Sequence, residues 1–361
     1  MSRPELVSEP EGVTPAWLTE ALRASGALPE GRVAGFTAAT VGTGQVGHNV
    51  RFALELEGAP GAAPRSVVGK FASRDPVSRA TGVAQGNYLR EVRFYQELAR
   101  TVDIRTPRCF FADIDPASSR FVLLMEDLAP ACQGDQIRGC TVEDAALALR
   151  ELAALHAPRY ADPALARLDW LQRRTPEGAM LVEALYRSVW PGFLQRFGHA
   201  LDADAVALME RLGSSLAAWM LSPSGPLTIT HGDYRLDNML FGTAEGGYPL
   251  AVVDWQTPSL GFALADASYF LGAGLLPETR RANERDLLRE YHRELSARGV
   301  RDLSFERCFE DYRRFSFSGV VMAVVASMIV GQSERGDAMF LAMATRHAAH
   351  ALDLEATKLL E

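Results

Sequence analysis

Lysine is almost missing from this chain. Its 361 residues include 37 basic ones, of which only Lys70 and Lys358 are lysine. Codon bias explains a general avoidance of lysine, but it does not explain why one is kept at the end of the strand-like segment 66–71. We therefore expect Lys70 to be a required point charge.

Paired cysteines and long apolar runs are missing as well. The four cysteines show no C-x-x-C pair, and a chain of this size needs no disulfide framework, so reduced thiols and a cytoplasmic location are predicted. The longest apolar run covers only 319–330, whereas a bilayer span needs about 20 residues. We expect a core helix there. The first residues show no signal segment, and His347 and His350 lack the further ligands of a zinc site.

A positive net charge is also absent. The formal net charge is −8, which argues against a non-specific grip on nucleic acid or on an anionic membrane. The composition, 48% apolar and 23% charged, is that of an ordinary globular protein, and the length suffices for two lobes. Neither nucleic acid nor a membrane is therefore expected as a partner, while the oligomeric state stays open.

The most informative part of the sequence is a pair of polar segments, 230–241 and 252–256, which together hold several acidic and amide side chains. Between them lies 242–249, a loop dense in turn residues. Apolar residues flank this loop on both sides, and that pattern predicts a short hairpin.

The expected register of this hairpin suggests a metal site. We expect Gly242 to face Leu250, which places Asn238 opposite Asp254. Directly opposed residues lie about 4.5–5.5 Å apart at Cβ, a separation that suits two oxygen ligands sharing one Mg²⁺. Asp233 would then lie beside that metal ion.

A glycine-rich motif precedes these segments. Gly42, Gly44 and Gly47 match G-x-G-x-x-G, a pattern that dinucleotide-binding folds and kinase phosphate loops share. A dinucleotide site needs a helix that starts within the motif, whereas apolar and polar residues alternate over 50–57, which indicates a strand. Strand, glycine loop and strand is the kinase arrangement, in which the loop covers the nucleotide phosphates. A glycine-rich hairpin without a ligand is the alternative.

Glu91 is the expected partner of Lys70. It lies on segment 85–102, whose apolar residues have helical spacing. An ion pair between the two side chains would hold the ammonium group towards the α- and β-phosphates of a nucleotide. The alternative is one more solvated helix carboxylate, like Glu97.

The periodicity breaks near 126–130, and we place the lobe boundary there. The predicted division is a nucleotide-binding lobe over 1–127, with a helical cap at 1–30, and a catalytic and substrate-binding lobe over 128–361. An extended segment between the lobes would offer backbone hydrogen bonds to an adenine. Helical patterns in the second lobe predict helices over 158–226, 284–298, 313–332 and 335–359.

These parts together support phosphoryl transfer, which needs a phosphate cover, a cation, Mg²⁺ and a carboxylate that orients the acceptor hydroxyl. The chain supplies the glycine loop as the cover, Lys70 as the cation and Asp233 as the carboxylate. Asn238 and Asp254 supply the oxygen ligands that a hard cation prefers.

Three nearby polar side chains receive no catalytic role from their pattern. We expect His156 to be a satisfied core or capping histidine. We expect Asp237 to be solvated or to form a turn. For Arg235 a surface position is favoured over a contact with phosphate.

His231-Gly-Asp-x-x-x-x-Asn238 and Val253-Asp-Trp-Gln256 together resemble the signature of the aminoglycoside phosphotransferase and choline kinase superfamily. Within it, the sequence looks closest to the ecdysteroid-kinase-like branch and its bacterial relatives. The resemblance covers about residues 40–275. It implies an α+β, protein-kinase-like bilobal fold. The first lobe would hold a five-stranded antiparallel sheet and one main helix, and the second would be mostly helical with a short catalytic hairpin.

The resemblance also implies ATP and Mg²⁺ as cofactors, and it implies roles for individual residues. Asp233 would be the catalytic base, with Asn238 and Asp254 as Mg²⁺ ligands. His231 would stabilise the catalytic loop, and Asp266 would connect the C-lobe helix to that loop. The backbone at Glu126 and Leu128 would contact adenine.

Departures from protein kinases favour a small acceptor. Gly232 stands where they carry arginine, Trp255-Gln256 replaces Phe-Gly, and no Ala-Pro-Glu follows. The predicted function is ATP- and Mg²⁺-dependent phosphorylation of a small alcohol. If the apolar segment 315–330 lines the pocket instead of forming plain core, that alcohol is lipophilic, such as a sterol or macrolide. The alternatives are an aminoglycoside- or choline-type kinase, an inactive nucleotide-binding scaffold, and a protein kinase.

Overall fold

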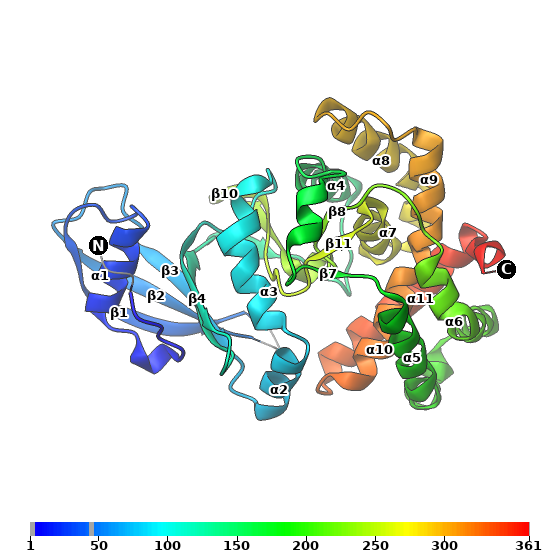
Figure 1. Ribbon diagram of the computed structural model, residues 1–361, viewed down its shortest axis with the longest axis horizontal. Coiled ribbons are helices and arrows are strands. Elements are labelled where there is room, and N and C mark those ends of the chain that lie inside the picture. Colours follow the sequence, from blue (N-terminus) through cyan, green and yellow to red (C-terminus); the bar gives the residue numbers. More distant parts are fainter. Residues whose placement is uncertain (1–3, 43–46, 361) are drawn as a thin grey trace.

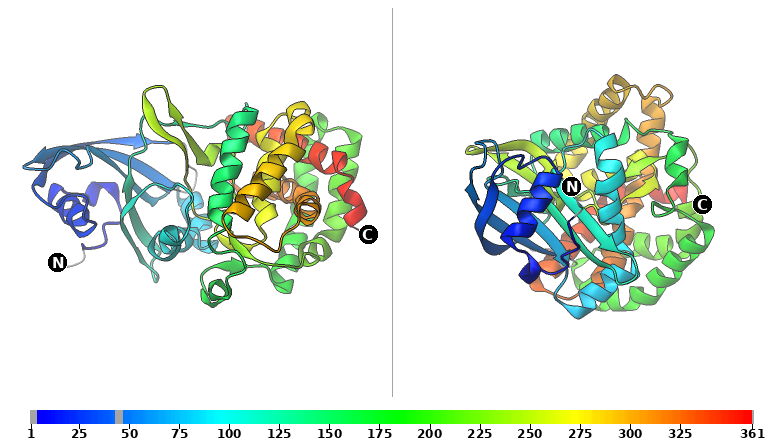
Figure 2. Two further views of the ribbon diagram at one scale, coloured as in Figure 1. Left: turned by 90° about the horizontal axis from the view of Figure 1, so that it is seen from above. Right: turned by 60° about the vertical axis from the view of Figure 1, so that its left-hand side comes forward.

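The computed structural model describes residues 4–42 and 47–360. A sheet-containing part formed by the first third of the chain lies beside a larger, mostly helical part, as Figures 1 and 2 show. We keep the division into 1–127 and 128–361 as a proposal.

The first part is built on a five-stranded antiparallel sheet, as expected, in the order β1-β2-β3-β5-β4. Successive side chains along a strand point to opposite faces, so the sheet has two different environments. One face packs against α1 in a core of its own, which includes Trp17 and Phe52. The other face joins the core of the helical part. The strands are β1 (Arg32–Val41), β2 (Gly47–Glu57), β3 (Ser66–Ala72), β4 (Cys109–Asp115) and β5 (Arg120–Glu126), and α1 is Pro15–Ala24.

The helix expected over 85–102 is present, but it is not uniform. It begins as α3 (Asn87–Arg93), widens to a π-helical turn at Phe94–Leu98 and ends in a 3-10 turn at Ala99–Thr101. A preceding helix, α2 (Pro76–Ala84), was not predicted. Phe94 stacks on Trp255 with ring centroids 3.9 Å apart, and this contact joins the helix to the catalytic segment.

The second part is mostly helical, as expected. Thr141 caps its first helix through a capping box with Asp144, in which each side chain accepts from the backbone N–H of the other residue. The apolar helix expected over 313–332 is divided by a 3-10 turn at Phe315–Phe317, and the last helix ends at Asp353 instead of continuing to 359. The helices are α4 (Val142–His156), α5 (Pro176–Phe197), α6 (Ala203–Leu221), α7 (Ala263–Gly274), α8 (Pro277–Ala297), α9 (Phe305–Arg314), α10 (Ser318–Ile329) and α11 (Glu334–Asp353).

Two small sheets carry the polar segments of the sequence. One has the order β10-β9-β6 and the other β7-β11-β8. Their strands are β6 (Cys132–Gln133), β7 (Gln172–Arg173), β8 (Thr228–Thr230), β9 (Met239–Thr243), β10 (Gly246–Val252) and β11 (Ser259–Gly261).

The predicted register of the catalytic hairpin was wrong by one residue. Leu250 faces Phe241 and Val252 faces Met239. Next along the hairpin, the Val253 N–H donates to the Asn238 carbonyl at 2.9 Å. The pairing is irregular between Gly246 and Leu250, so the β10 side takes up two extra residues near the turn. Within the described ranges, no helix is long and apolar enough to cross a bilayer.

Candidate active site

The catalytic loop connects β8 to β9, and Asp266 of α7 holds its start. The backbone N–H groups of His231 and Gly232 donate to the two Asp266 carboxylate oxygens at 2.6 and 3.0 Å. Gly232 has φ +80, and a Cβ there would lie 2.4 Å from the Thr257 carbonyl oxygen. No residue but glycine therefore fits at this position.

His231 links the loop to the segment that carries Asp254. Its Nε2–H donates to the Val253 carbonyl at 3.0 Å, and its Nδ1 accepts from the Asp233 backbone N–H at 3.3 Å. The bracing and tying contacts expected of His231 and Asp266 are thus both in place. Their importance for catalysis stays a prediction.

Three side chains hold the Asp233 carboxylate. Arg235 Nε donates to both oxygens at 3.1 and 3.0 Å, and Asn238 Nδ2 donates to Oδ2 at 2.9 Å. The Tyr269 hydroxyl, from α7, donates to Oδ1 at 2.9 Å. The carboxylate is therefore fixed in one orientation before any substrate binds.

Asn238 and Asp254 fit a Mg²⁺ ion by the chemistry of their donors. The Asn238 amide nitrogen is hydrogen-bonded to the backbone and the side chain of Asp233. The amide oxygen is therefore the atom of this side chain that can coordinate a metal ion. Asp254 has φ +67, and its side chain is 37% exposed. Among the residues that the structure describes, no three His, Cys, Asp or Glu gather as a metal site. Mg²⁺ needs no such group, since it takes one or two carboxylates and substrate phosphates.

Lys70 lies between two carboxylates. Its Nζ is 2.7 Å from Glu91 Oε1, as expected, and 2.7 Å from Asp254 Oδ1. Burial lowers the pKa of Lys70, but the negative charges of Asp254 and Glu91 outweigh it and raise this pKa above its ordinary value. Lys70 therefore stays positively charged in this position.

The glycine-rich segment connects β1 to β2, two antiparallel strands, so the dinucleotide-binding alternative is excluded because no helix follows the motif. Gly42 has φ +78. A Cβ at Gly47 would lie 2.8 Å from Lys70 Cε, so glycine leaves room for the lysine side chain. Gly44 lies outside the described residues.

The segment expected to contact adenine follows β5. Asp127 accepts from Arg51 Nη2 at 2.9 Å and from Ser66 Oγ at 2.7 Å, and the Leu128 carbonyl accepts from the Ala131 N–H at 2.9 Å. The Glu126 side chain accepts from Arg105 Nη2 at 2.6 Å. These contacts fix the course of the segment, while adenine recognition at Glu126 and Leu128 stays a prediction.

Sequence reasoning missed three residues of this site. Asp237 lies in a 3-10 turn, Leu236–Asn238, as one of the two expectations had it, but it is buried instead of solvated. It accepts from Arg235 Nη1 at 2.8 Å and from Arg335 Nη2 at 3.1 Å. Arg235 is held between two carboxylates and is no surface arginine. Tyr269 could have been found, because it lies three residues after Asp266 and so on the same face of its helix.

The expectation for His156 is confirmed. Its ring is fully buried, and Nδ1 lies 2.7 Å from the Tyr291 hydroxyl. It is a core histidine with a partner.

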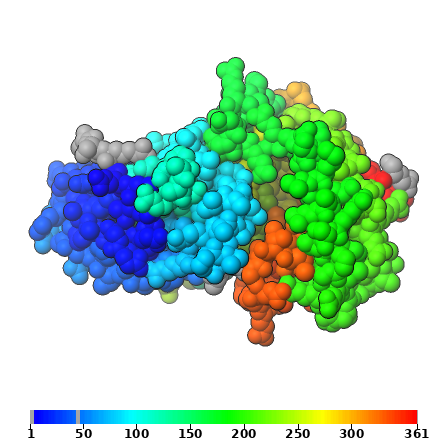
Figure 3. Space-filling model, turned by 60° about the horizontal axis from the view of Figure 1, so that its bottom comes forward, coloured from blue at the N-terminus to red at the C-terminus, as the bar shows by residue number. Residues whose placement is uncertain are grey.

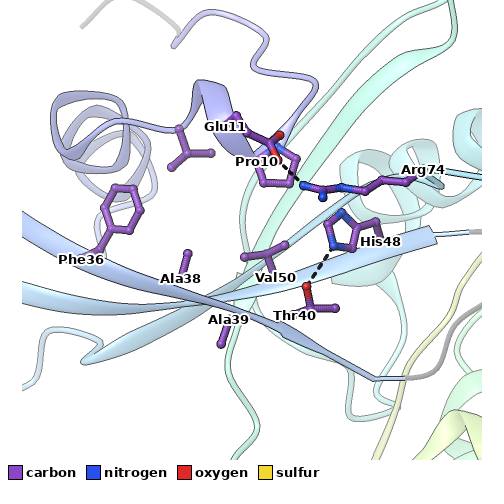
Figure 4. A pocket seen from close by; sticks show the side chains of 10 residues that line it. Pro10, Glu11, Phe36, Ala38, Ala39, Thr40, His48, Val50 and Arg74 are labelled. Atoms are coloured by element: carbon purple, nitrogen blue, oxygen red, sulfur yellow. Dashed lines mark hydrogen bonds and ion pairs between the residues drawn. The ribbon is translucent and has the colours of Figure 1, made fainter.

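A cavity of about 380 Å³ lies on the face of the N-terminal sheet opposite to the Lys70 side chain (Figure 4). Its walls include Ala38, His48 and Val50. Lys70 pairs with Asn49, and Asn49 points away from the side of its neighbours His48 and Val50. This cavity is therefore separate from the catalytic residues.

Comparisons with known proteins agree with this geometry. Residues 65–302 match the model of the phosphotransferase enzyme family. A shorter match joins 83 residues to mouse acyl-CoA dehydrogenase family member 10 at 36% identity. It covers 22% of this chain, and the chain spans only 7% of that protein.

Three solved structures share the fold. Choline kinase from Cryptosporidium parvum Iowa II has a TM-score of 0.55 at 10% identity, over 89% of each chain. The GDP complex of aminoglycoside 2'-phosphotransferase-IIIa has a TM-score of 0.53 at 12% identity, over 93% of this chain and 99% of that one. Ethanolamine kinase from Plasmodium vivax has a TM-score of 0.50 at 8% identity, over 89% and 83% of the two chains. At these identities the likeness shows the fold alone.

The kinase-like fold is confirmed, and the family match confirms the expected class of phosphotransferase. The chain belongs to the phosphotransferase enzyme family.

Proposed function

We propose that this protein transfers the γ-phosphoryl group of ATP to a hydroxyl of a small, lipophilic alcohol. The observation that supports this reaction is the grouping of four side chains. The fixed carboxylate of Asp233 lies in hydrogen-bond contact with Asn238, and Asp254 of the same hairpin lies in contact with Lys70. A base, two oxygen ligands and a cation are the parts that phosphoryl transfer requires.

Each residue has one task in this proposal. Asp233 orients the acceptor hydroxyl and takes its proton as the oxygen attacks the γ-phosphorus. Lys70, held by Glu91, neutralises the α- and β-phosphates. Asn238 and Asp254 would hold Mg²⁺, which when bound supplies neutralisation of the charge on the phosphate oxygens.

The pairing of acidic side chains bears on the class of acceptor. A polycationic acceptor would need unpaired acids beside the apolar segment 315–330, but three of its acidic neighbours already have partners. Asp311 pairs with Arg307 at 2.8 Å and Glu310 with Arg313 at 3.5 Å, and Asp337 pairs with Arg196. These pairs favour a neutral acceptor over an aminoglycoside.

A hollow beside the apolar helix α10 supports the lipophilic character of the acceptor. Figure 3 shows the molecule hollowed between the cyan α2–α3 segment and the green α5, where the orange α10 reaches the surface. Ile329, the last residue of α10, is 37% exposed.

Trp255-Gln256 supports placing the chain in the ecdysteroid-kinase-like branch of the family.

The function is tested by incubating the protein with MgATP and a panel of a sterol, a macrolide, an aminoglycoside and choline. Phosphorylated product is detected by mass spectrometry and ³¹P NMR. We expect product from the sterol or the macrolide. Product from the aminoglycoside or choline alone would replace the proposed acceptor class, and nucleotide binding without any product would indicate an inactive scaffold.

A further inference from the structure

Tyr269 ties the catalytic carboxylate to the interior of the helical part. Its hydroxyl donates to Asp233 Oδ1 at 2.9 Å, and the residue is almost fully buried. Burial, and after it the Asp233 charge, raise the pKa of the Tyr269 phenol well above its ordinary value. The phenol therefore stays protonated and acts as a permanent donor towards this carboxylate.

The Tyr269 ring has a rigid support behind it. It stacks on His347 of α11 with ring centroids 5.4 Å apart and an angle of 20° between the ring planes. The His347 ring is fully buried, and neither of its nitrogens has a hydrogen-bond partner. It thus acts by shape and not by hydrogen bonding.

Two glycines make room for the His347 ring. A Cβ at Gly319 of α10 would lie 2.0 Å from His347 Nε2, and a Cβ at Gly272 of α7 would lie 2.5 Å from Nδ1. Distances this short exclude any side chain at either position. The two glycines therefore leave a slot for the ring, which stands there stacked against Tyr269.

We propose that Tyr269 is a positioning residue for the phosphotransfer reaction, and that it holds Asp233 in the orientation needed to take the acceptor proton while the slot of Gly272, His347 and Gly319 holds Tyr269. This inference rests on the function proposed above. Arg235 and Asn238 also bind Asp233, but both belong to the same loop as Asp233. Of the three, Tyr269 is the one that lies on a different element, α7.

The test compares Tyr269→Phe with Tyr312→Phe, a matched control. Tyr312 is also fully buried in the helical part, and its hydroxyl donates to a carboxylate, Glu284 Oε2, at 2.8 Å. Each variant loses one phenol–carboxylate hydrogen bond, but only the first loses it at Asp233. A general loss of packing would affect both alike.

We expect Tyr269→Phe to lower kcat about tenfold, the usual effect of losing a hydrogen bond to a charged group, with KM for MgATP unchanged. Tyr312→Phe should keep both kcat and KM. Equal kcat for the two variants would overturn the proposal.

Two further measurements keep the test decisive. The ¹³C carboxyl signal of Asp233, identified by its absence in Asp233→Asn, should shift in Tyr269→Phe and not in Tyr312→Phe. This signal reports the hydrogen bond without turnover. A wild-type protein that forms no product would therefore refute the proposed function, and the contact would still be measured separately.

His347→Ala should lower kcat like Tyr269→Phe, whereas His347→Phe, which keeps a ring in the slot, should have a kcat near that of the wild type. An active His347→Ala variant would refute the role of the slot.

Discussion

Lys70 Nζ lies 2.7 Å from Asp254 Oδ1, and this ion pair joins the sheet of the first part to the catalytic hairpin of the second. The same ammonium group lies 2.7 Å from Glu91. Lys70 thus compensates two carboxylates from distant parts of the sequence. Because the interior screens charge poorly, removing the ammonium would leave Glu91, which is 1% exposed, without a counter-charge.

The first prediction concerns this lysine. Lys70→Met should destabilise the protein by about 3–5 kcal/mol, the typical effect of breaking a buried ion pair, and it should abolish phosphotransfer. Urea unfolding measures the first effect and MgATP turnover the second. The control is Lys358→Met, since Lys358 is 62% exposed and pairs with Glu355 on the surface. A Lys70 variant as stable as this control would contradict the structural role.

The second prediction tests the base. Asp233→Asn should lower kcat by about 10²–10⁴-fold, the typical contribution of general-base assistance, while MgADP binding stays near that of the wild type. The amide keeps the size of the side chain but cannot take the acceptor proton. Isothermal titration calorimetry checks nucleotide binding. Unchanged turnover would remove Asp233 from its proposed role.

The third prediction separates two arginines that share a partner. Arg235 and Arg335 both bind Asp237, but only Arg235 also binds Asp233. Arg235→Met should therefore lower kcat by at least about tenfold through the loss of a charged hydrogen bond. Arg335→Met should leave kcat within about twofold. If both variants lose the same activity, the relevant contact is the one with Asp237.

The fourth prediction concerns stability at low pH. Burial, with the positive charges of Arg280 and Arg346, lowers the pKa of His347 to about 3, whereas an unfolded histidine titrates near 6.5. Below pH ~6.5 the unfolded chain binds a proton that the folded chain does not bind. Stability is therefore lost as the pH falls from about 6.5 towards 3, at up to about 1.4 kcal/mol per pH unit.

Carboxylates also titrate in this range, so the fourth prediction is read as a difference between variants. His347→Phe should flatten the stability curve between pH 4 and pH 6.5 relative to the wild type. His199→Phe is the control, because His199 is exposed. Urea unfolding across the pH range measures both variants. Parallel curves for His347→Phe and the wild type would show that His347 does not stay neutral in the folded protein.

The sequence by itself determined the parts of the site that depend on local order along the chain. Asp233 and Asn238 lie in one loop, and apolar strands and turn residues fix that loop and its hairpin. The strand that follows the glycine motif excluded a dinucleotide site, and the scarcity of lysine drew attention to Lys70. These features are visible in sequence because backbone periodicity and turn chemistry are local properties.

Only the tertiary structure decided the supports that come from distant elements. The hairpin register depended on an irregular turn, so Asn238 pairs with Val253 instead of Asp254. The contact between Tyr269 and Asp233 needs α7 to pack beside the loop, and the His347 slot needs three helices to meet. Packing between distant helices depends on side-chain shape in three dimensions, which periodicity along the chain does not encode.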